Sequence, residues 1–117
     1  MRPSYARAIP RAWRQTAGMF VALGDPHRQR ILLMFDPGER LNVGQIVAVS
    51  TLSRSAVSHH LRVLRDAGVL LSEKIGKEVW YWPDPHAVRA ALTAVLEYLD
   101  VQMTPRRQPP TPGRTRN

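Results

Sequence analysis

Two short amphipathic segments joined by four residues constrain the fold of this chain more than any other feature of its sequence. Asn42 precedes the first segment, residues 43–49, and asparagine is a favoured N-cap residue of helices. Ser53 precedes the second segment, residues 54–66, and Gly68 follows it, as is typical of a helix end. The apolar face of the second segment consists of Val57, Leu61 and Leu64. Two helices with so short a connection predict a helix-turn-helix unit.

Two strand-like runs follow this unit directly. Residues 69–75 and 78–82 contain aliphatic and aromatic side chains, and Gly76 and Lys77 separate them. Glycine at the first central position suits a type II′ turn. The sequence therefore predicts a β-hairpin that presents Lys77 at its tip, with Lys74 close by.

Further helices are expected over residues 11–23, 26–35 and 85–100. Asp25-Pro26 and Asp84-Pro85 each combine an N-cap residue with a proline in the first turn, which marks two of the helix starts. Leu41 is expected to form a brief strand. The predicted fold class is mainly α with a small β-hairpin wing, in the order ααααββα.

The positive charge is concentrated at the two ends of the chain. The sequence has 17 Lys and Arg against nine Asp and Glu, a formal charge of +8, yet residues 17–100 hold nine of each sign. Residues 101–117 contain arginines and prolines without an acid, a composition that disfavours a folded segment. We expect a basic N-terminal arm over residues 1–11, a folded domain over 12–100 and an Arg/Pro-rich disordered tail over 101–117.

The composition also excludes several classes of protein. The chain has no cysteine, so it has no disulfide, no thiolate metal site and no thiol-based redox response. A run of ~18 apolar residues and a signal peptide are both absent, so we expect a soluble, cytoplasmic protein without membrane contact. The sequence offers no nucleophile with a base and no convergent carboxylates, so we do not expect an enzyme. Its excess of cations favours nucleic acid as a partner.

The side of residues 54–66 opposite the apolar face is polar and cationic. It carries Arg54, Ser55, Ser58, His59, Arg62 and Arg65. Such side chains bond base edges in a major groove or neutralise phosphates, although an ordinary solvated helix has a similar surface. The hairpin that follows places Lys74 and Lys77 where a wing contacts neighbouring DNA, which favours the DNA-binding interpretation. We therefore predict a winged helix-turn-helix protein that binds double-stranded DNA.

Three segments combine into a recognisable family pattern. They are residues 23–32 with Leu-Gly-Asp-Pro-His-Arg, residues 52–70 with Ser-His-His-Leu and a later Ala-Gly, and residues 74–81. Over about residues 12–100 the chain resembles the ArsR/SmtB family of bacterial winged-helix transcriptional regulators. The resemblance implies a homodimeric repressor that binds an inverted repeat near a promoter.

The resemblance also assigns roles to individual positions. The groove-reading role falls to Ser55, Ser58, His59 and Arg62, the phosphate role to Arg54 and Arg65, and the wing-tip role to Lys77. Lysine at the wing tip, where the family more often has arginine, favours a phosphate contact over minor-groove readout. The implied dimer interface joins the first and last helices through Trp13, Ala17, Phe20, Val88, Leu92, Val95 and Leu99. A two-fold dimer sets its recognition helices about one DNA turn, ~34 Å, apart.

Metal control is possible in this family through two kinds of site. The thiolate site is absent, because residues 43–47 contain no cysteine. A second family site, in the last helix, corresponds here to Asp84, His86, Glu97 and Asp100. Oxygen and imidazole ligands suit zinc, nickel or manganese, but His86 and Glu97 lie ~16 Å apart along one helix, so two subunits are needed. Asp84 is equally explained as an N-cap. We expect no cofactor, with a divalent metal as the alternative.

Two rival functions and a pocket for an effector are also compatible with the sequence. A basic RNA-binding or other nucleic-acid-binding protein could act through its tails alone, and a winged helix can also serve protein contacts only. Trp80 and Trp82 could line a pocket for a small effector of unknown identity, although packing against helices is favoured. We expect His27 in a first turn and His60 as a hydrogen-bonded core histidine.

Overall fold

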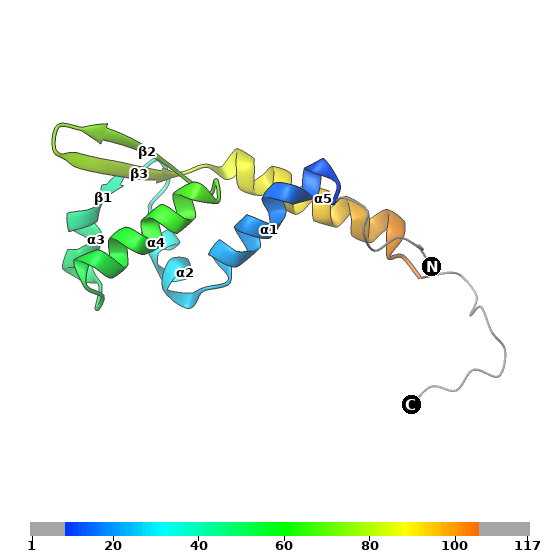
Figure 1. Cartoon of the computed structure of the whole chain (residues 1–117), viewed down its shortest axis with the longest axis horizontal. Coiled ribbons are helices and arrows are strands. Elements are labelled where there is room, and N and C mark those ends of the chain that lie inside the picture. The colour runs from blue at the N-terminus through cyan, green and yellow to red at the C-terminus, as the bar shows by residue number, and fades with distance from the viewer. Residues whose placement is uncertain (1–8, 106–117) are drawn as a thin grey trace, which may run out of the picture.

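The computed structural model describes residues 9–105 of the chain. In chain order these residues form α1 (Arg11–Leu23), α2 (Pro26–Leu32), β1 (Leu41–Asn42), α3 (Val43–Val49), α4 (Arg54–Asp66), β2 (Leu70–Ile75), β3 (Glu78–Pro83) and α5 (Pro85–Gln102) (Figure 1). The predicted class, mainly helical with a small hairpin, is confirmed, and the brief strand expected at Leu41 is β1. None of the described helices is long and apolar enough to span a membrane.

Four of the helices begin with a side-chain cap at the residue that the sequence indicates. Asp25 accepts hydrogen bonds from the first turn of α2, Ser53 from that of α4 and Asp84 from that of α5. Asn42 and Gln45 form a capping box on α3, in which each side chain bonds the other residue's backbone N–H. Because these bonds depend on a few neighbouring residues, local sequence determines where the helices start.

The three strands form one small antiparallel sheet in the order β1-β3-β2. Leu41 of β1 pairs with Tyr81 of β3, and the hairpin closes where Ile75 pairs with Glu78. Gly76 has a φ of 64°, the left-handed backbone conformation that the predicted turn requires at this position. The free end of the hairpin thus projects beside α3 and α4 (Figure 1).

The core lies beneath the helix-turn-helix unit. The predicted apolar face of α4 is fully buried, since Val57, Leu61 and Leu64 each have 0% exposure. Ile31 of α2, Ile46 of α3 and Tyr81 of β3 are buried in the same cluster. Removal of a side chain such as Leu61 would cost about 2–5 kcal/mol, which is enough to threaten a domain of this size.

A second part of the molecule consists of α1 and α5, which lie side by side and extend away from the hairpin (Figure 1). The rings of Trp13 and Tyr98 meet edge to face with their centres 5.4 Å apart. The buried face of α1 is formed by Thr16, Met19 and Ala22. The stripe that the sequence indicated is a different face: Phe20 is 47% exposed, and Ala17 is exposed as well.

Two expected boundaries need correction. Helix α2 ends at Leu32 and does not extend to Phe35, because Met34 and Phe35 donate to carbonyls three residues back and so form tight turns. Helix α5 continues to Gln102, two residues past the expected end and into the expected tail. Residues 1–8 of the expected arm (1–11) and residues 106–117 of the expected tail (101–117) lie outside the described residues.

Candidate nucleic-acid interface

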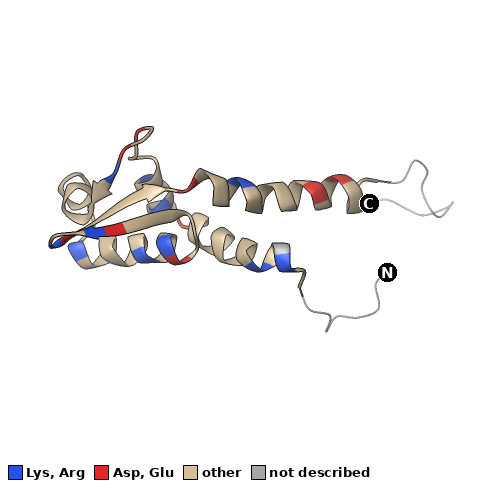
Figure 2. Cartoon of the chain, turned by 90° about the horizontal axis from the view of Figure 1, so that it is seen from above, with Lys and Arg blue, Asp and Glu red and all other residues tan. Residues whose placement is uncertain are grey.

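The outer side of α4 is open to solvent along its length. Ser55, His59 and Arg62 are exposed, Ser58 is half-buried, and the helix packs on the core with its opposite side. Figure 2 shows Lys and Arg along α4 and on the hairpin, whereas the long α5 is mostly uncharged. Most cations of the described residues therefore lie at the helix-turn-helix end, with Arg11, Arg14 and Arg89 on α1 and α5 as exceptions.

A hollow of about 240 Å³ lies between α4, the start of α3 and the base of the hairpin turn. Arg54, Ser58 and Arg62 line it from α4, and Lys77 lines it from the hairpin. The three residues of α4 are spaced four apart, so they share one face of the helix, and the fold brings Lys77 of the wing, 15 residues after Arg62, to the same surface. Three cations and a hydroxyl around one concave polar surface suit the phosphates and base edges of a nucleic acid. We call this surface the basic hollow.

Asn42 and Glu78 also line the hollow and were not among the sequence candidates. Asn42 is 8% exposed, caps α3 and donates through Nδ2 to Glu78 Oε2 at 3.3 Å. Glu78 thus links the hairpin to the helix-turn-helix unit and places a carboxylate among the three cations. Glu78 is adjacent to Lys77 in the sequence, and a carboxylate there partly offsets the positive charge of the wing. This adjacency was the available indication that Glu78 belongs to the site.

Four other predicted residues lie outside the basic hollow. Ser55 is exposed in the first turn of α4, where its Oγ is 3.3 Å from that of Ser53. Arg65 donates through Nε and Nη2 to Asp66 Oδ1 in an exposed ion pair, so its charge is partly compensated. His59 and Lys74 are exposed, on α4 and β2 respectively. The structure therefore separates the sequence candidates into a clustered group and a peripheral group.

The comparisons with known proteins identify the family. The sequence model described as "Bacterial regulatory protein, arsR family" matches residues 25–72, from the cap of α2 into β2. The chain is 34% identical over 95 residues to the HTH-type transcriptional repressor SmtB of Mycobacterium tuberculosis, covering 80% of this chain and 70% of that protein. It is 30% identical over 81 residues to the HTH-type transcriptional regulator YgaV of Escherichia coli, covering 69% and 82% respectively. The chain belongs to the arsR family of bacterial regulatory proteins.

Solved structures of the same family have the same fold. The ArsR-like transcriptional regulator from Rhodococcus sp. RHA1 superposes with a TM-score of 0.67 at 24% identity, covering 78% of this chain and 84% of that one. The transcriptional repressor PagR of Bacillus anthracis gives 0.56 at 27% identity, covering 73% and 95%. The resemblance seen in the sequence is thus confirmed, and this arsR-family chain is a winged-helix transcriptional regulator. The family is one of regulators and is not an enzyme class.

The four metal candidates on α5 do not come together within one arsR-family chain. Asp84 Oδ1 accepts from Ala87 N at 3.3 Å, which caps the helix. His86, Glu97 and Asp100 are exposed along the following turns. Across residues 9–105, no group of three or more His, Asp or Glu side chains could hold a metal ion. A site from these residues requires a second subunit.

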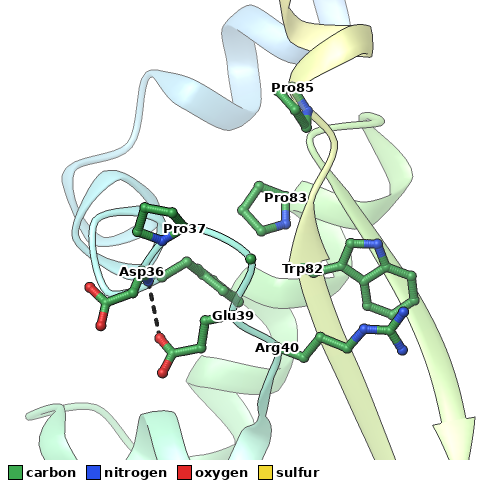
Figure 3. A pocket seen from close by; sticks show the side chains of 9 residues that line it. Asp36, Pro37, Glu39, Arg40, Trp82, Pro83 and Pro85 are labelled. Carbon is green, nitrogen blue, oxygen red and sulfur yellow. Dashed lines mark hydrogen bonds between the residues drawn. The ribbon is translucent and has the colours of Figure 1, made fainter.

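A separate cavity of about 540 Å³ lies between the loop after α2 and the junction of β3 with α5 (Figure 3). Pro37 and Pro83 face each other across it, with Glu39 and Arg40 at its edge. The Arg40 guanidinium lies 3.8 Å from the centre of the Trp82 ring. The volume of the cavity is within the range of small-molecule sites. The cavity shares no lining residue with the basic hollow. Trp82 therefore lines a cavity, as the small-effector alternative required.

Proposed function

We propose that this chain is a homodimeric repressor that binds an inverted repeat in duplex DNA through α4 and the hairpin. The observation that carries the proposal is the basic hollow, where Arg54, Ser58 and Arg62 of the second helix meet Lys77 of the wing. Membership in a family of bacterial regulatory proteins supports the same function. The relatives that are named repressors, such as SmtB of Mycobacterium tuberculosis, favour repression over activation.

Each residue of the interface has a role that its chemistry supports. Arg62 pairs with a guanine edge, because its planar guanidinium can donate two parallel hydrogen bonds. Ser58 and His59 contribute shorter donors and acceptors on the same face of α4. Arg54, in the first turn of α4, neutralises a phosphate, and Lys77 does so from the wing. Ser55, Arg65 and Lys74, outside the hollow, add peripheral backbone contacts.

Dimerisation supplies the second half of the operator contact. Leu92, Leu96 and Leu99 of α5 are 44–56% exposed, and Phe20 of the adjoining α1 is 47% exposed. An apolar surface of this kind is unfavourable in water and is typical of an interface. A second copy is the occupant that an inverted repeat demands, since two-fold symmetry of the DNA site requires two-fold symmetry of the protein. Three further residues of the expected interface, Trp13, Val88 and Val95, are half-buried.

The remaining parts of the chain have subsidiary roles in this proposal. The arm at residues 1–11 and the tail beyond α5 add salt-sensitive, sequence-independent affinity through their arginines. Metal control through Asp84, His86, Glu97 and Asp100 is the alternative mode of regulation. Because Asp84 Oδ1 accepts the capping bond, Oδ2 is the oxygen that would bind the metal.

The test is a binding experiment on duplexes that the full chain selects from a random library. The S58A/R62A variant should lose sequence-specific binding, which would be read by fluorescence anisotropy. Deletion of residues 106–117 should preserve the selected sequence and reduce mainly the salt-dependent part of the affinity. The reverse pattern, with specificity independent of Ser58 and Arg62 and binding abolished by the deletion, would support a nucleic-acid-binding protein that acts through its tail. Repetition with zinc, nickel and manganese would reveal metal control.

A further inference from the structure

The side chain of Arg28 joins three helices at the edge of the helix-turn-helix unit. Arg28 belongs to α2, and its Nε donates to the carbonyl of Ala22 in α1 at 2.8 Å. Its Nη2 donates to the carbonyl of Val21 at 3.2 Å. Its Nη1 lies 3.2 Å from Nδ1 of His60 in α4. The guanidinium is planar and its donors form a fixed fork, so the three bonds together fix the relative positions of these helices.

The Arg28 link joins a helix of the proposed dimer interface, α1, to the helix of the proposed DNA contact, α4. Val21 and Ala22 lie at the C-terminal end of α1, the helix that contributes Phe20 to the proposed dimer interface. His60 lies on α4 between Ser58 and Arg62, which line the basic hollow. A rotation of α4 about this link would therefore move the DNA-contacting side chains relative to the dimer axis. Operator spacing depends on that geometry.

The contact also defines the protonation state of His60. A guanidinium has donors and no acceptor, so Nδ1 of His60 must accept and the ring is neutral with its proton on Nε2. Burial lowers the pKa of His60, the charge of Arg28 lowers it further, and the carboxylate of Asp25 opposes both. His27 of α2 stacks on the ring at 5.8 Å and His59 of α4 lies 5.7 Å away, so two further imidazoles face it.

We infer that Arg28 is a positioning residue for operator binding, which holds α4 to the end of α1 through neutral His60, and that a proton on His60 releases α4. The inference rests on the proposed function, because its readout is DNA affinity. A protonated ring offers Arg28 a donor and a positive charge in place of an acceptor, so the contact becomes repulsive.

The experiment compares two variants at position 60 in the full chain. His60→Asn places an amide oxygen close to the position of Nδ1 and cannot be protonated, so it retains the acceptor at every pH. His60→Leu removes the acceptor at every pH. The probe is a fluorescein-labelled duplex with the site that the wild-type chain selects from a random library. A second duplex with one base pair added between the half-sites reports the relative placement of the two α4 helices.

We expect His60→Asn and wild type to bind equally at pH 8, and wild type to bind several-fold more weakly than His60→Asn at pH 5.5. His60→Leu should bind more weakly than wild type at pH 8 and should discriminate less between the two duplexes. Arg28→Lys should behave in the same way as His60→Leu, because an ammonium is a point donor that cannot span three acceptors. Circular dichroism at each pH selects conditions in which all variants are folded.

The outcomes separate the inference from the proposed function. Selection of a site by wild type, together with loss of binding in Arg62→Ala, supports the proposed function. If the DNA affinity of His60→Asn relative to that of wild type is then the same at pH 8 and pH 5.5, the inference is wrong and the proposed function stands. If wild type selects no duplex, both are wrong as statements about DNA. A long-range ¹H–¹⁵N spectrum in which the neutral ring of His60 carries its proton on Nδ1 would also overturn the inference, without any DNA.

Discussion

The two ends of this molecule expose opposite kinds of surface. At the α3–α4–hairpin end the apolar face of α4 is buried and its cations face outward, with Arg54, Arg62 and Lys77 around one hollow. At the α1–α5 end large apolar side chains are exposed beside a few charged ones, and Leu96 is 56% and Val21 68% exposed. The cationic surface of the first end suits a polyanion. The exposed apolar side chains of the second end suit an apolar partner that removes them from water.

This contrast separates the residues that stabilise the fold from those that are available to bind a second copy. A hydrophobic core of this size stabilises a single small domain, and most of this core lies at the helix-turn-helix end. The α1–α5 arm has few fully buried side chains, and most of its apolar surface remains available to another copy. Substitutions in the basic hollow should therefore leave dimerisation intact, whereas loss of the dimer should also weaken operator binding, because the second half-site contact depends on the dimer.

The largest expected effect is loss of the cations of the basic hollow. The double substitution R54A/R62A removes four contacts from a dimer, and about 1 kcal/mol for each gives a loss of operator affinity on the order of 1000-fold. R11A/R14A removes the same charge from α1, where both arginines are exposed and outside the hollow. Anisotropy titrations should show only a modest, salt-dependent loss for this control. Equal losses in the two variants would mean that net charge alone determines binding.

A somewhat smaller effect is expected at the other end from Leu96→Glu. A carboxylate in an apolar interface loses its hydration, so two of them should raise the dimer dissociation constant on the order of 100-fold. Light scattering after size-exclusion chromatography should then show a monomer at micromolar concentration. Leu33→Glu is the matched control, because Leu33 is 85% exposed but lies at the end of α2, away from the arm. A dimer that persists in L96E, or dissociates in L33E, would contradict the assignment of the interface.

Glu78→Gln should strengthen DNA binding, by about 1 kcal/mol or several-fold. The substitution removes a carboxylate from the basic hollow, while the amide oxygen of glutamine still accepts from Asn42. Glu73→Gln is the matched control on the same hairpin, since Glu73 pairs with Arg40 outside the hollow at 3.1 Å. Parallel titrations at two salt concentrations would test this. Equal tightening in both variants would show that the hollow is not the site of contact.

The smallest effect concerns stability and pH. Burial lowers the pKa of His60 in the folded chain, so below about pH 6.5 the unfolded state binds a proton that the folded state binds less well. His60 therefore contributes full stability above pH 6.5, and this contribution falls as the pH decreases. The midpoint of thermal unfolding should decline less between pH 7 and 5.5 in His60→Asn than in wild type. Parallel declines in the two proteins would show that other groups cause the loss.

The sequence predicted the parts of this molecule that depend on near neighbours. Asp25, Asn42, Ser53 and Asp84 cap helices within three residues, and the turn at Gly76 needs two central residues. These local signals were enough for the element order and for the outward face of α4. The family resemblance added the roles of residues on that face, which periodicity alone leaves open.

The parts that the sequence did not predict depend on contacts between distant segments. The side of α1 that packs on the core carries Thr16 and Ala22, which are less hydrophobic than the exposed Phe20, so apolar periodicity selected the other face. The bond between Asn42 and Glu78 spans 36 residues, and that between Arg28 and His60 spans 32. Each pair becomes apparent only when the fold brings α2, α4 and the hairpin together.

Hydroxyl-radical footprinting of the full chain on its selected duplex tests the two-ended arrangement most directly. In the proposed dimer, two copies joined through the α1–α5 arms would place two α4 helices on one face of the DNA. We expect two protected segments about one helical turn, ~34 Å, apart, which disappear in R54A/R62A. A single protected segment, or protection that survives in R54A/R62A, would contradict this arrangement.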